Sequence, residues 1–237
     1  RSAKAGLKDP DKPMAVFLLV GPSGVGKTET ALTVADVMFG GEKFLVSINM
    51  SEYQDREMGV SGLVGAKPGY VGYGKGGTLT EAVRQTPYSV VLLDEVEKAC
   101  QEVRNLFYQV FDKGDLTDGT GRSIDFKNTV IFITSNLASQ EIQDLVKAKA
   151  ALLETPTAEE VLAAVRPILS KALQPAWLAR CTLVPYFSLQ GEALREITKL
   201  KLAKVAKRLK ASHKLDVTID EKVIDQIAER CTEVETG

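Results

Sequence analysis

Short apolar runs alternate with amphipathic stretches along the first half of this chain. The runs are rich in valine, isoleucine and leucine, and they cover residues 14–20, 44–49, 88–93 and 129–134. Hydrophobicity that continues from residue to residue, without a polar face, is typical of parallel strands that are buried on both sides. Because helical segments separate these runs, the pattern predicts a doubly wound α/β domain built on a parallel sheet.

Three segments between the runs show helical spacing, at residues 27–39, 79–85 and 96–112. The first ends at Gly40 and Gly41, and glycines of this kind commonly stop a helix. The segment 59–77 is so rich in glycine that we expect a loop there, neither a strand nor a buried helix. A loop of that length inside a compact domain is usually functional.

The composition changes after Asn136. Residues 137–178 are rich in alanine, leucine and glutamate, and they predict helices that break at Pro156 and Pro167. A short strand over 183–187 is expected to close a large domain that covers residues 1–187. The remainder, 188–237, predicts a small, incomplete C-terminal α/β lid domain, with helices over 192–211 and 221–230 and a strand over 216–219.

Charge and cysteine content exclude several classes of protein. The 30 Lys and Arg residues nearly balance the 31 Asp and Glu residues, so the basic excess of many nucleic-acid-binding domains is missing. Cys100, Cys181 and Cys231 lack metal-ligand spacing and are odd in number, which argues against a zinc site or a disulfide framework. His213 is the only histidine, which excludes a metal site built on several histidines. No apolar leader or membrane-length run occurs, so we expect a soluble cytoplasmic protein without a membrane partner.

One stretch follows the pattern G-x-x-x-x-G-K-[ST] between an expected strand and an expected helix, which is the setting of a phosphate-binding P-loop. Glycines let backbone N–H groups curl around phosphate oxygens, and the positive end of the next helix faces the same oxygens. We expect Lys27 to neutralise the β- and γ-phosphates of ATP, and the Thr28 hydroxyl to ligate Mg²⁺. The stretch consists of Gly21, Pro22, Ser23, Gly24, Val25, Gly26, Lys27 and Thr28.

Polar side chains stand at the ends of two further expected strands. Asp94 and Glu95 follow the run 88–93, at the strand end where doubly wound sheets bind ligands. We expect Asp94 to hold Mg²⁺ and Glu95 to orient and polarise the attacking water, because phosphoryl transfer depends on positioning and charge stabilisation. Asn136 is expected near the γ-phosphate and that water. Taken singly, the two carboxylates also fit an acidic helix cap, and Asn136 fits a turn.

At these motifs the chain resembles AAA+ ATPases, and among them the second ATPase ring of the Clp-type unfoldases. The resemblance is specific over residues 1–140 and looser beyond them. It implies a homo-hexamer that hydrolyses ATP with Mg²⁺ and threads a protein substrate through its central pore. The similar segments are 1–7, 21–28, 50–53, 68–74, 79–84, 94–99 and 118–122.

The resemblance also implies roles for residues outside the P-loop. Residues 69–72 match the family's Gly-Tyr-Val-Gly pore loop, and residues 115–122 match its second pore loop. An aromatic side chain on a glycine-hinged loop can grip a polypeptide of any sequence, although a packed aromatic is the alternative for Tyr70. Arg180 stands where the family has an arginine that acts on the neighbouring subunit, but its surroundings, residues 178–181, depart from the usual Asn-Arg-Ile/Leu-Asp. The pore-loop residues are Gly69, Tyr70, Val71 and Gly72.

Other differences from the family's usual motifs indicate which Clp type the chain resembles most. Residues 99–101 read Ala-Cys-Gln in place of Ala-His-Pro, which we expect to affect packing only. No Ile-Gly-Phe/Leu tripeptide occurs between Leu137 and Arg180, so no peptidase partner is expected. Segments 40–42, 111–114 and 184–186 are most similar to ClpV-type ATPases, which recycle contracted type VI secretion sheaths, and next to ClpB-type disaggregases. The sequence ends before the family's Gly-Ala-Arg motif, so the second sensor arginine is not expected within it.

Two other functions remain open on the sequence alone. The incomplete lid fits an assembly module with little activity of its own. A basic stripe on the helix 192–211 fits either a nucleic-acid motor or an ordinary solvated face. The near-zero net charge and the tyrosine loop favour protein substrates over nucleic acid. The stripe consists of Lys199, Lys201, Lys204, Lys207, Arg208 and Lys210.

Overall fold

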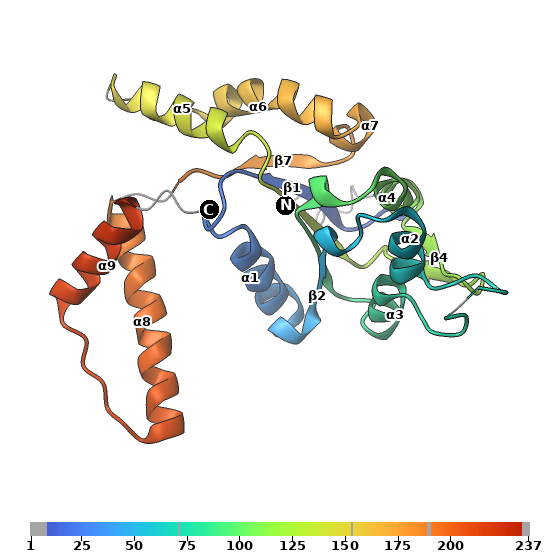
Figure 1. Cartoon of the computed structure of the whole chain (residues 1–237), viewed down its shortest axis with the longest axis horizontal. Coiled ribbons are helices and arrows are strands. Elements are labelled where there is room, and N and C mark those ends of the chain that lie inside the picture. Colours follow the sequence, from blue (N-terminus) through green and yellow to red (C-terminus); the bar gives the residue numbers. More distant parts are fainter. Residues whose placement is uncertain (1–8, 71, 153, 189–190, 234–237) are drawn as a thin grey trace. The chain divides into compact units, whose positions relative to one another are not determined.

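The computed structural model describes residues 9–70, 72–152, 154–188 and 191–233, with side chains up to residue 230 (Figure 1). The chain divides into two compact units, Arg1–Phe187 and Ser188–Gly237. Each unit is described separately below. Among the described residues, no helix is long and apolar enough to cross a membrane.

The first unit is built on a five-stranded parallel sheet with the strand order β2-β3-β6-β1-β7. The four apolar runs and the segment 183–187 all form strands, each within two residues of its expected ends. The parallel sheet of the predicted fold class is therefore confirmed. The strands are β1 (Ala15–Val20), β2 (Leu45–Asn49), β3 (Val90–Asp94), β6 (Val130–Ser135) and β7 (Thr182–Pro185).

Helices cover both faces of this sheet, which explains why its strands read as continuous apolar runs. The helices of the first unit are α1 (Lys27–Phe39), α2 (Arg56–Val64), α3 (Thr78–Gln85), α4 (Gln101–Lys113), α5 (Ser139–Ala150), α6 (Ala158–Ala172) and α7 (Pro175–Leu178). A small antiparallel hairpin follows α4, and it consists of β4 (Asp115–Thr117) and β5 (Ser123–Asp125).

Side chains of each strand alternate between the two faces. On one face Leu19, Leu92 and Phe132 pack against Ala31 and Ala35 of α1. The opposite face belongs to a larger cluster shared with α4 and α6, and Figure 1 shows α1 and α5–α7 on opposite sides of β1 and β7. Burial of each large aliphatic side chain contributes about 1.5–3 kcal/mol, so the sheet is a stiff platform for the polar residues at its edge. The sheet residues of the larger cluster are Leu18, Val20, Val91, Leu93, Ile131 and Ile133.

Three expectations about the helices were wrong. The helix expected over 96–112 begins only at Gln101, because residues 96–98 form a separate 3₁₀ turn. Part of the expected loop 59–77 is helical, because α2 extends to Val64 and buries Gly59 and Leu63. A Cβ on Gly59 would lie 2.9 Å from Val103, so this glycine allows α2 to approach α4 closely. Pro167 does not break α6, which continues through it.

The continuation of α6 through a proline has a physical cause. Proline removes one backbone donor inside a helix and normally kinks or ends it. The N-terminus of α6 is fixed by a capping box, in which Thr157 and Glu160 hydrogen-bond each other's backbone N–H groups. Val161, Val165 and Leu169 are fully buried beneath the helix. Capping and packing together therefore outweigh the lost hydrogen bond.

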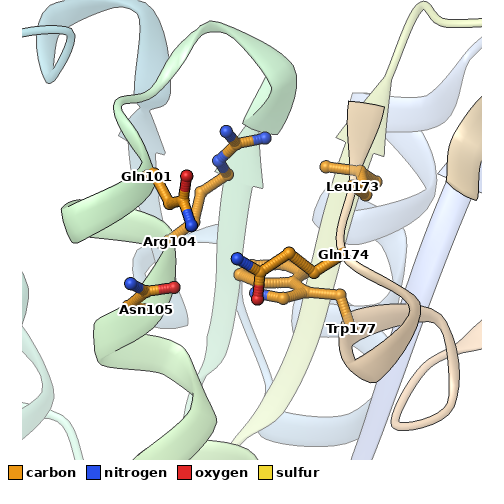
Figure 2. Close-up of a pocket in the computed structure, with 6 residues that line it drawn as sticks. All are labelled: Gln101, Arg104, Asn105, Leu173, Gln174 and Trp177. Carbon is orange, nitrogen blue, oxygen red and sulfur yellow. The ribbon is translucent and has the colours of Figure 1, made fainter. Parts of the chain in front are cut away.

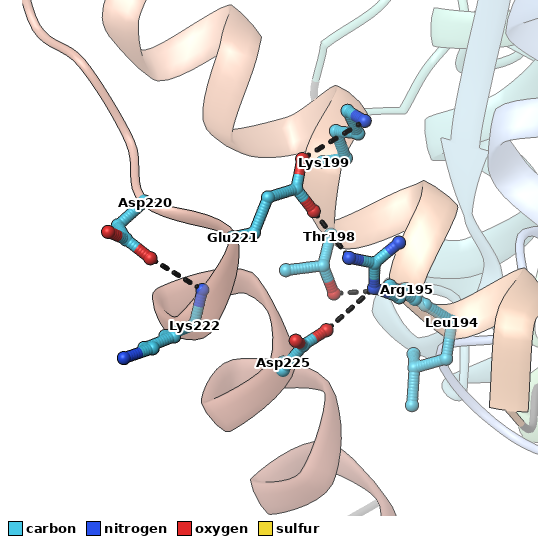
Figure 3. Close-up of polar contacts among 8 residues, drawn as sticks. All are labelled: Leu194, Arg195, Thr198, Lys199, Asp220, Glu221, Lys222 and Asp225. Atoms are coloured by element: carbon cyan, nitrogen blue, oxygen red, sulfur yellow. Dashed lines mark hydrogen bonds and ion pairs between the residues drawn. The ribbon is translucent and has the colours of Figure 1, made fainter.

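The second unit is helical in its described residues, with α8 (Gly191–His213) and α9 (Glu221–Glu233). Arg195 joins them, since its Nε donates to Asp225 at 2.6 Å and its guanidinium also pairs with Glu221 (Figure 3). The strand expected over 216–219 does not form, because a single strand in this unit has no neighbour to satisfy its backbone N–H and C=O groups. The expectation of an α/β lid was therefore wrong for the described residues.

The basic stripe of α8 is partly neutralised within the second unit. Lys199 lies 3.4 Å from Glu221 (Figure 3), and Lys210 lies 2.6 Å from Asp216. Positive charges that are paired in this way attract phosphates less strongly than isolated ones. These ion pairs therefore favour the interpretation of the basic stripe as a solvated helix face over that of a nucleic-acid-binding surface.

Candidate active site

The loop between β1 and α1 has the backbone shape of an anion cradle. Gly24 and Gly26 have φ angles of +76° and +97°, in the left-handed region that glycine adopts without strain. Gly21 has a different constraint, because a Cβ there would collide with the carbonyl oxygen of Tyr186. Tyr186 also donates its N–H to Val20 at 2.7 Å, so β7 fixes the start of the loop from the side.

Lys27 lies at the centre of the site and is only 7% exposed. Its Nζ donates to the carbonyl oxygens of Gly21 and Pro22, both at 2.7 Å, and to Oδ1 of Asn136 at 2.8 Å. Burial lowers the pKa of this ammonium group, and the nearby carboxylates oppose that effect. A buried cation at the N-terminal end of a helix, here α1, is suited to binding phosphate oxygens.

Asp94 and Glu95 are held at the end of β3 by one hydroxyl group of β6. Thr134 donates to Asp94, and the same oxygen accepts the backbone N–H of Glu95 at 3.0 Å. Glu95 has a φ of +57°, which is uncommon for a residue with a side chain. Such conformations persist only where the surrounding structure imposes them, and they cluster at functional sites.

Asn136 connects the lysine to the carboxylates. Its Nδ2 donates to Glu95 at 3.1 Å, while its Oδ1 accepts from Lys27. Its backbone N–H donates to Oε1 of Glu97 at 3.1 Å. The structure therefore brings together four of the residues singled out in the sequence, from three elements, and adds Thr134 and Glu97.

The donor set fits a magnesium ion bound mainly by ATP and water. Mg²⁺ prefers oxygen ligands and usually keeps several waters beside one or two protein groups. The hydroxyl of Thr28, at the start of α1, and the carboxylate of Asp94 are oxygen donors of this kind. No cluster of three or more His, Cys, Asp or Glu side chains able to hold a metal occurs in the described part of the chain. Such an ion would therefore depend on the nucleotide for its remaining ligands.

A second conspicuous feature is the loop that carries Tyr70. The side chain of Tyr70 is 70% exposed, so the packed alternative for this aromatic is wrong for the described structure. Gly69 and Gly72 have φ angles of +89° and +91°, and Val71 lies outside the described residues. An isolated bridge between Gly65 and Gly76 closes the base of the loop.

The turn 118–122 packs against the base of the Tyr70 loop. Gly119 donates its N–H to Val64 at 2.8 Å, and a Cβ on Gly119 would collide with Gly65. Oδ1 of Asp118 accepts from the backbone of Thr120 and Arg122, which fixes the turn. The turn 118–122 and the base of the Tyr70 loop therefore form one packed unit.

Arg180 follows α7 and is held by α4. Its Nε and Nη2 donate to the two carboxylate oxygens of Asp112, both at 2.7 Å, and its guanidinium lies 5.4 Å from the ring centre of Tyr108. These hydrogen bonds lower the pKa of Asp112. Arg180 is thus presented beside α4 rather than joined to the Lys27–Asn136–Glu95 cluster.

A small pocket lies close to this arginine, between α4 and the segment before α7 (Figure 2). It has room for about one water molecule, so it is too small for a substrate. Nε1 of Trp177, which lines the pocket, is buried and has no hydrogen-bond partner among the described residues. The remaining lining residues are Gln101, Arg104, Asn105, Leu173 and Gln174.

Comparison with known proteins agrees with this geometry. The sequence model of the AAA domain (Cdc48 subfamily) matches residues 12–184. The chain belongs to this AAA family. Residues 189–237 match the C-terminal D2-small domain of ClpB protein. The resemblance to Clp-type AAA+ ATPases is therefore confirmed, and with it membership of a family of ATP-hydrolysing enzymes.

Two relatives illustrate the similarity. Chaperone protein ClpB of Yersinia enterocolitica is 51% identical over 236 residues, and AAA+ ATPase ClpV1 of Pseudomonas aeruginosa is 51% identical over 237 residues. Each alignment covers 100% of this chain and 26% of the relative. The chain thus spans about a quarter of the length of these relatives. Because the two identities are equal, they establish a ClpB- and ClpV-like AAA+ domain and do not separate the two types.

Proposed function

We propose that this chain hydrolyses ATP within a hexameric ring and uses the reaction to move protein. The hydrolytic part rests on one observation, the bridge that Asn136 forms between Lys27 and Glu95. Lys27 would bind the β- and γ-phosphates, and Glu95 would orient and polarise the attacking water. The side-chain amide of Asn136 would keep Lys27 and Glu95 at fixed positions relative to the γ-phosphate.

The proposed hydrolysis also requires a magnesium ion. Held by Thr28 and Asp94, the ion would supply charge neutralisation to the β- and γ-phosphate oxygens. The hydroxyl of Thr134 orients the carboxylate of Asp94 for this role. Outer partners of this kind fix the geometry of metal ligands.

The mechanical part rests on the Tyr70 loop. Tyr70 is exposed on a segment with glycines on both sides, and the neighbouring turn 118–122 packs against its base. We propose that this tyrosine grips an extended polypeptide in the pore of a homo-hexamer, since a large aromatic side chain binds many different sequences. Arg180 is proposed to act on ATP bound to the neighbouring subunit.

For the substrate, we propose contracted type VI secretion sheaths, acted on in the cytoplasm. The proposal is supported by the segments 40–42, 111–114 and 184–186 and by the similarity to ClpV1. Disaggregation of misfolded protein is the second candidate, and the ClpB relative and the match to the ClpB D2-small domain favour it.

One experiment separates these candidates. The complete protein is mixed with ATP and Mg²⁺, first alone, then with contracted sheaths, and then with a heat-aggregated reporter enzyme. Phosphate release with loss of sedimentable sheath is the expected result. Recovery of reporter activity without sheath disassembly would favour the disaggregase, and no phosphate release under any condition would contradict ATP hydrolysis.

A further inference from the structure

A third carboxylate, Glu97, reaches the active site from the turn that follows β3. The chain makes a 3₁₀ turn over Val96–Lys98 immediately after Glu95, whose positive φ starts the turn. This turn brings Oε1 of Glu97 to 3.1 Å from the backbone nitrogen of Asn136. Oε2 of Glu97 is buried and has no hydrogen-bond partner among the described residues.

The hydrogen bond from the backbone N–H of Asn136 to Glu97 takes the place of a hydrogen bond between β6 and β3. Pairing of β3 with β6 ends at Leu93 and Ile133, so β3 no longer holds the backbone of β6 at Asn136. A backbone N–H left without a partner in a partly buried position is costly, and its peptide can rotate. The carboxylate of Glu97 fills this place and fixes the peptide that precedes the Asn136 side chain.

Fixing that peptide matters because the Asn136 side chain has two partners at once. Its Oδ1 lies 2.8 Å from Lys27 and its Nδ2 lies 3.1 Å from Glu95. Both contacts depend on the direction in which the Cα–Cβ bond leaves the backbone. A rotation of the peptide would move the amide away from both partners.

We propose that Glu97 is a positioning residue for hydrolysis, which acts on the reaction through Asn136. The inference rests on the proposed ATPase function. Glu97 forms a hydrogen bond with neither Lys27 nor Glu95 among the described residues, although its negative charge acts on Lys27 together with Asp94 and Glu95. Because its one hydrogen bond to the site goes to Asn136, we expect its loss to affect the chemical step more than nucleotide binding. What it provides is a hydrogen-bond acceptor, which glutamine also offers and alanine does not.

The test uses the complete protein and follows kcat, the KM for ATP and the Kd for a fluorescent ADP analogue. Glu97→Ala is expected to lower kcat by roughly 10- to 100-fold, the usual loss for an outer partner of an active-site group, with KM and Kd within about twofold. Glu97→Gln should restore most of kcat. Glu102→Ala serves as the matched control. Glu102 is a half-exposed residue of α4 that pairs with Arg56 of α2, so its loss should leave kcat unchanged.

A double-mutant cycle with Asn136→Ala shows whether the two residues act as a unit. If they do, the Glu97→Ala/Asn136→Ala double variant is no slower than Asn136→Ala alone. If the losses of kcat in the two single variants multiply in the double variant, the proposal is overturned. A Glu97→Gln variant as slow as Glu97→Ala would also overturn it, because the negative charge rather than the hydrogen bond would then matter. If the unmodified protein releases no phosphate, the ATPase proposal itself fails. Normal hydrolysis that Glu97→Ala does not slow refutes only the role of Glu97.

Discussion

Lys27 and Asn136 are 109 residues apart in the chain, and their side chains meet at 2.8 Å. Asn136 also donates to Glu95. One amide group therefore lies between Lys27, a cation suited to binding phosphate, and Glu95, a carboxylate suited to orienting a water molecule. Lys27 begins α1, which follows β1, and Asn136 comes directly after β6, and the strands β1 and β6 are direct neighbours in the sheet. The bridge is therefore a product of the strand order.

Replacing Asn136 by aspartate should test this bridge directly. The substitution keeps an acceptor for Lys27 but loses the donor to Glu95 and places two negative charges side by side. We expect kcat to fall by roughly 10²-fold, similar to the loss of one polar group from a preorganised site. Asn136→Ser, which keeps a hydroxyl donor on a shorter side chain, is the comparison. An aspartate variant that hydrolyses ATP at the normal rate would show that the donated hydrogen bond has no part in catalysis.

Glu95→Gln should separate binding from hydrolysis. Glutamine keeps the size of the side chain and removes the charge that polarises water, so turnover should fall by roughly 10²- to 10⁴-fold. ATP affinity should stay within a few-fold of normal, because Lys27 and the glycine loop are intact. Phosphate release measures the first quantity, and equilibrium binding of a fluorescent ATP analogue measures the second. Persistent turnover would assign the water-orienting role to another group.

The sheet and the P-loop could be predicted from the sequence, because both are local patterns. Continuous apolar runs identify buried parallel strands, and the G-x-x-x-x-G-K-[ST] spacing identifies the loop. Thr134 and Glu97 could not be found in this way. Thr134 contacts Asp94 and Glu95 only because β3 and β6 are adjacent, and no spacing rule reveals that neighbour. Glu97 stands three residues after Asp94, but the contact with Asn136 depends on the unusual backbone of Glu95.

The wrong expectations about secondary structure have a common origin. Gly59 in α2 and Pro167 in α6 have low helix propensity, yet tertiary packing and capping keep both helices intact. The segment 216–219 is the opposite case, since its residues favour a strand but no partner strand is available in the second unit. In each case long-range contacts, which a single sequence does not display, outweigh the local preference.

Tyr70→Ala should leave ATP hydrolysis nearly normal and stop substrate movement. The side chain is exposed and is not one of the residues that bond within the Lys27–Asn136–Glu95 cluster, so its loss should not disturb the chemistry. Substrate movement is measured as loss of sheath or recovery of aggregated reporter per ATP hydrolysed. Tyr88→Ala is the matched control, because Tyr88 is 59% exposed but lies outside the loop. Equal substrate movement by the two variants would contradict a gripping role for Tyr70.

Trp177 should be essential for the stability of the face that carries Arg180. Its indole ring is 1% exposed and packs edge-on against Phe107 and Phe111, with ring centres at 6.0 and 5.1 Å. Removal of such a side chain costs about 3–5 kcal/mol, so Trp177→Ala should lower the free energy of unfolding of the first unit by about that amount. Denaturant titration of the complete protein, followed by circular dichroism, measures it. Trp177→Phe should lose much less, and equal losses would argue against a packing role.

Arg180 is proposed to act on the ATP of a neighbouring subunit, and mixed rings test this without knowledge of the substrate. Arg180→Ala and Glu95→Gln proteins should each be inactive as pure assemblies, because one lacks the arginine and the other the water-orienting carboxylate. In a mixed ring, some interfaces combine Arg180 from one subunit with Glu95 from the next. Phosphate release should therefore reappear on mixing and be greatest near equal proportions.

The pairing of Arg180 with Asp112 supplies the control for that experiment. The pair is bidentate but partly exposed, and such surface pairs contribute less than about 1 kcal/mol. Asp112→Ala should consequently release Arg180 at little cost and leave hydrolysis close to normal. If the mixed rings stay inactive while Asp112→Ala abolishes hydrolysis, Arg180 has a structural role within its own subunit. Activity in the mixed rings would require that the arginine cross the interface, since neither parent protein has a complete site.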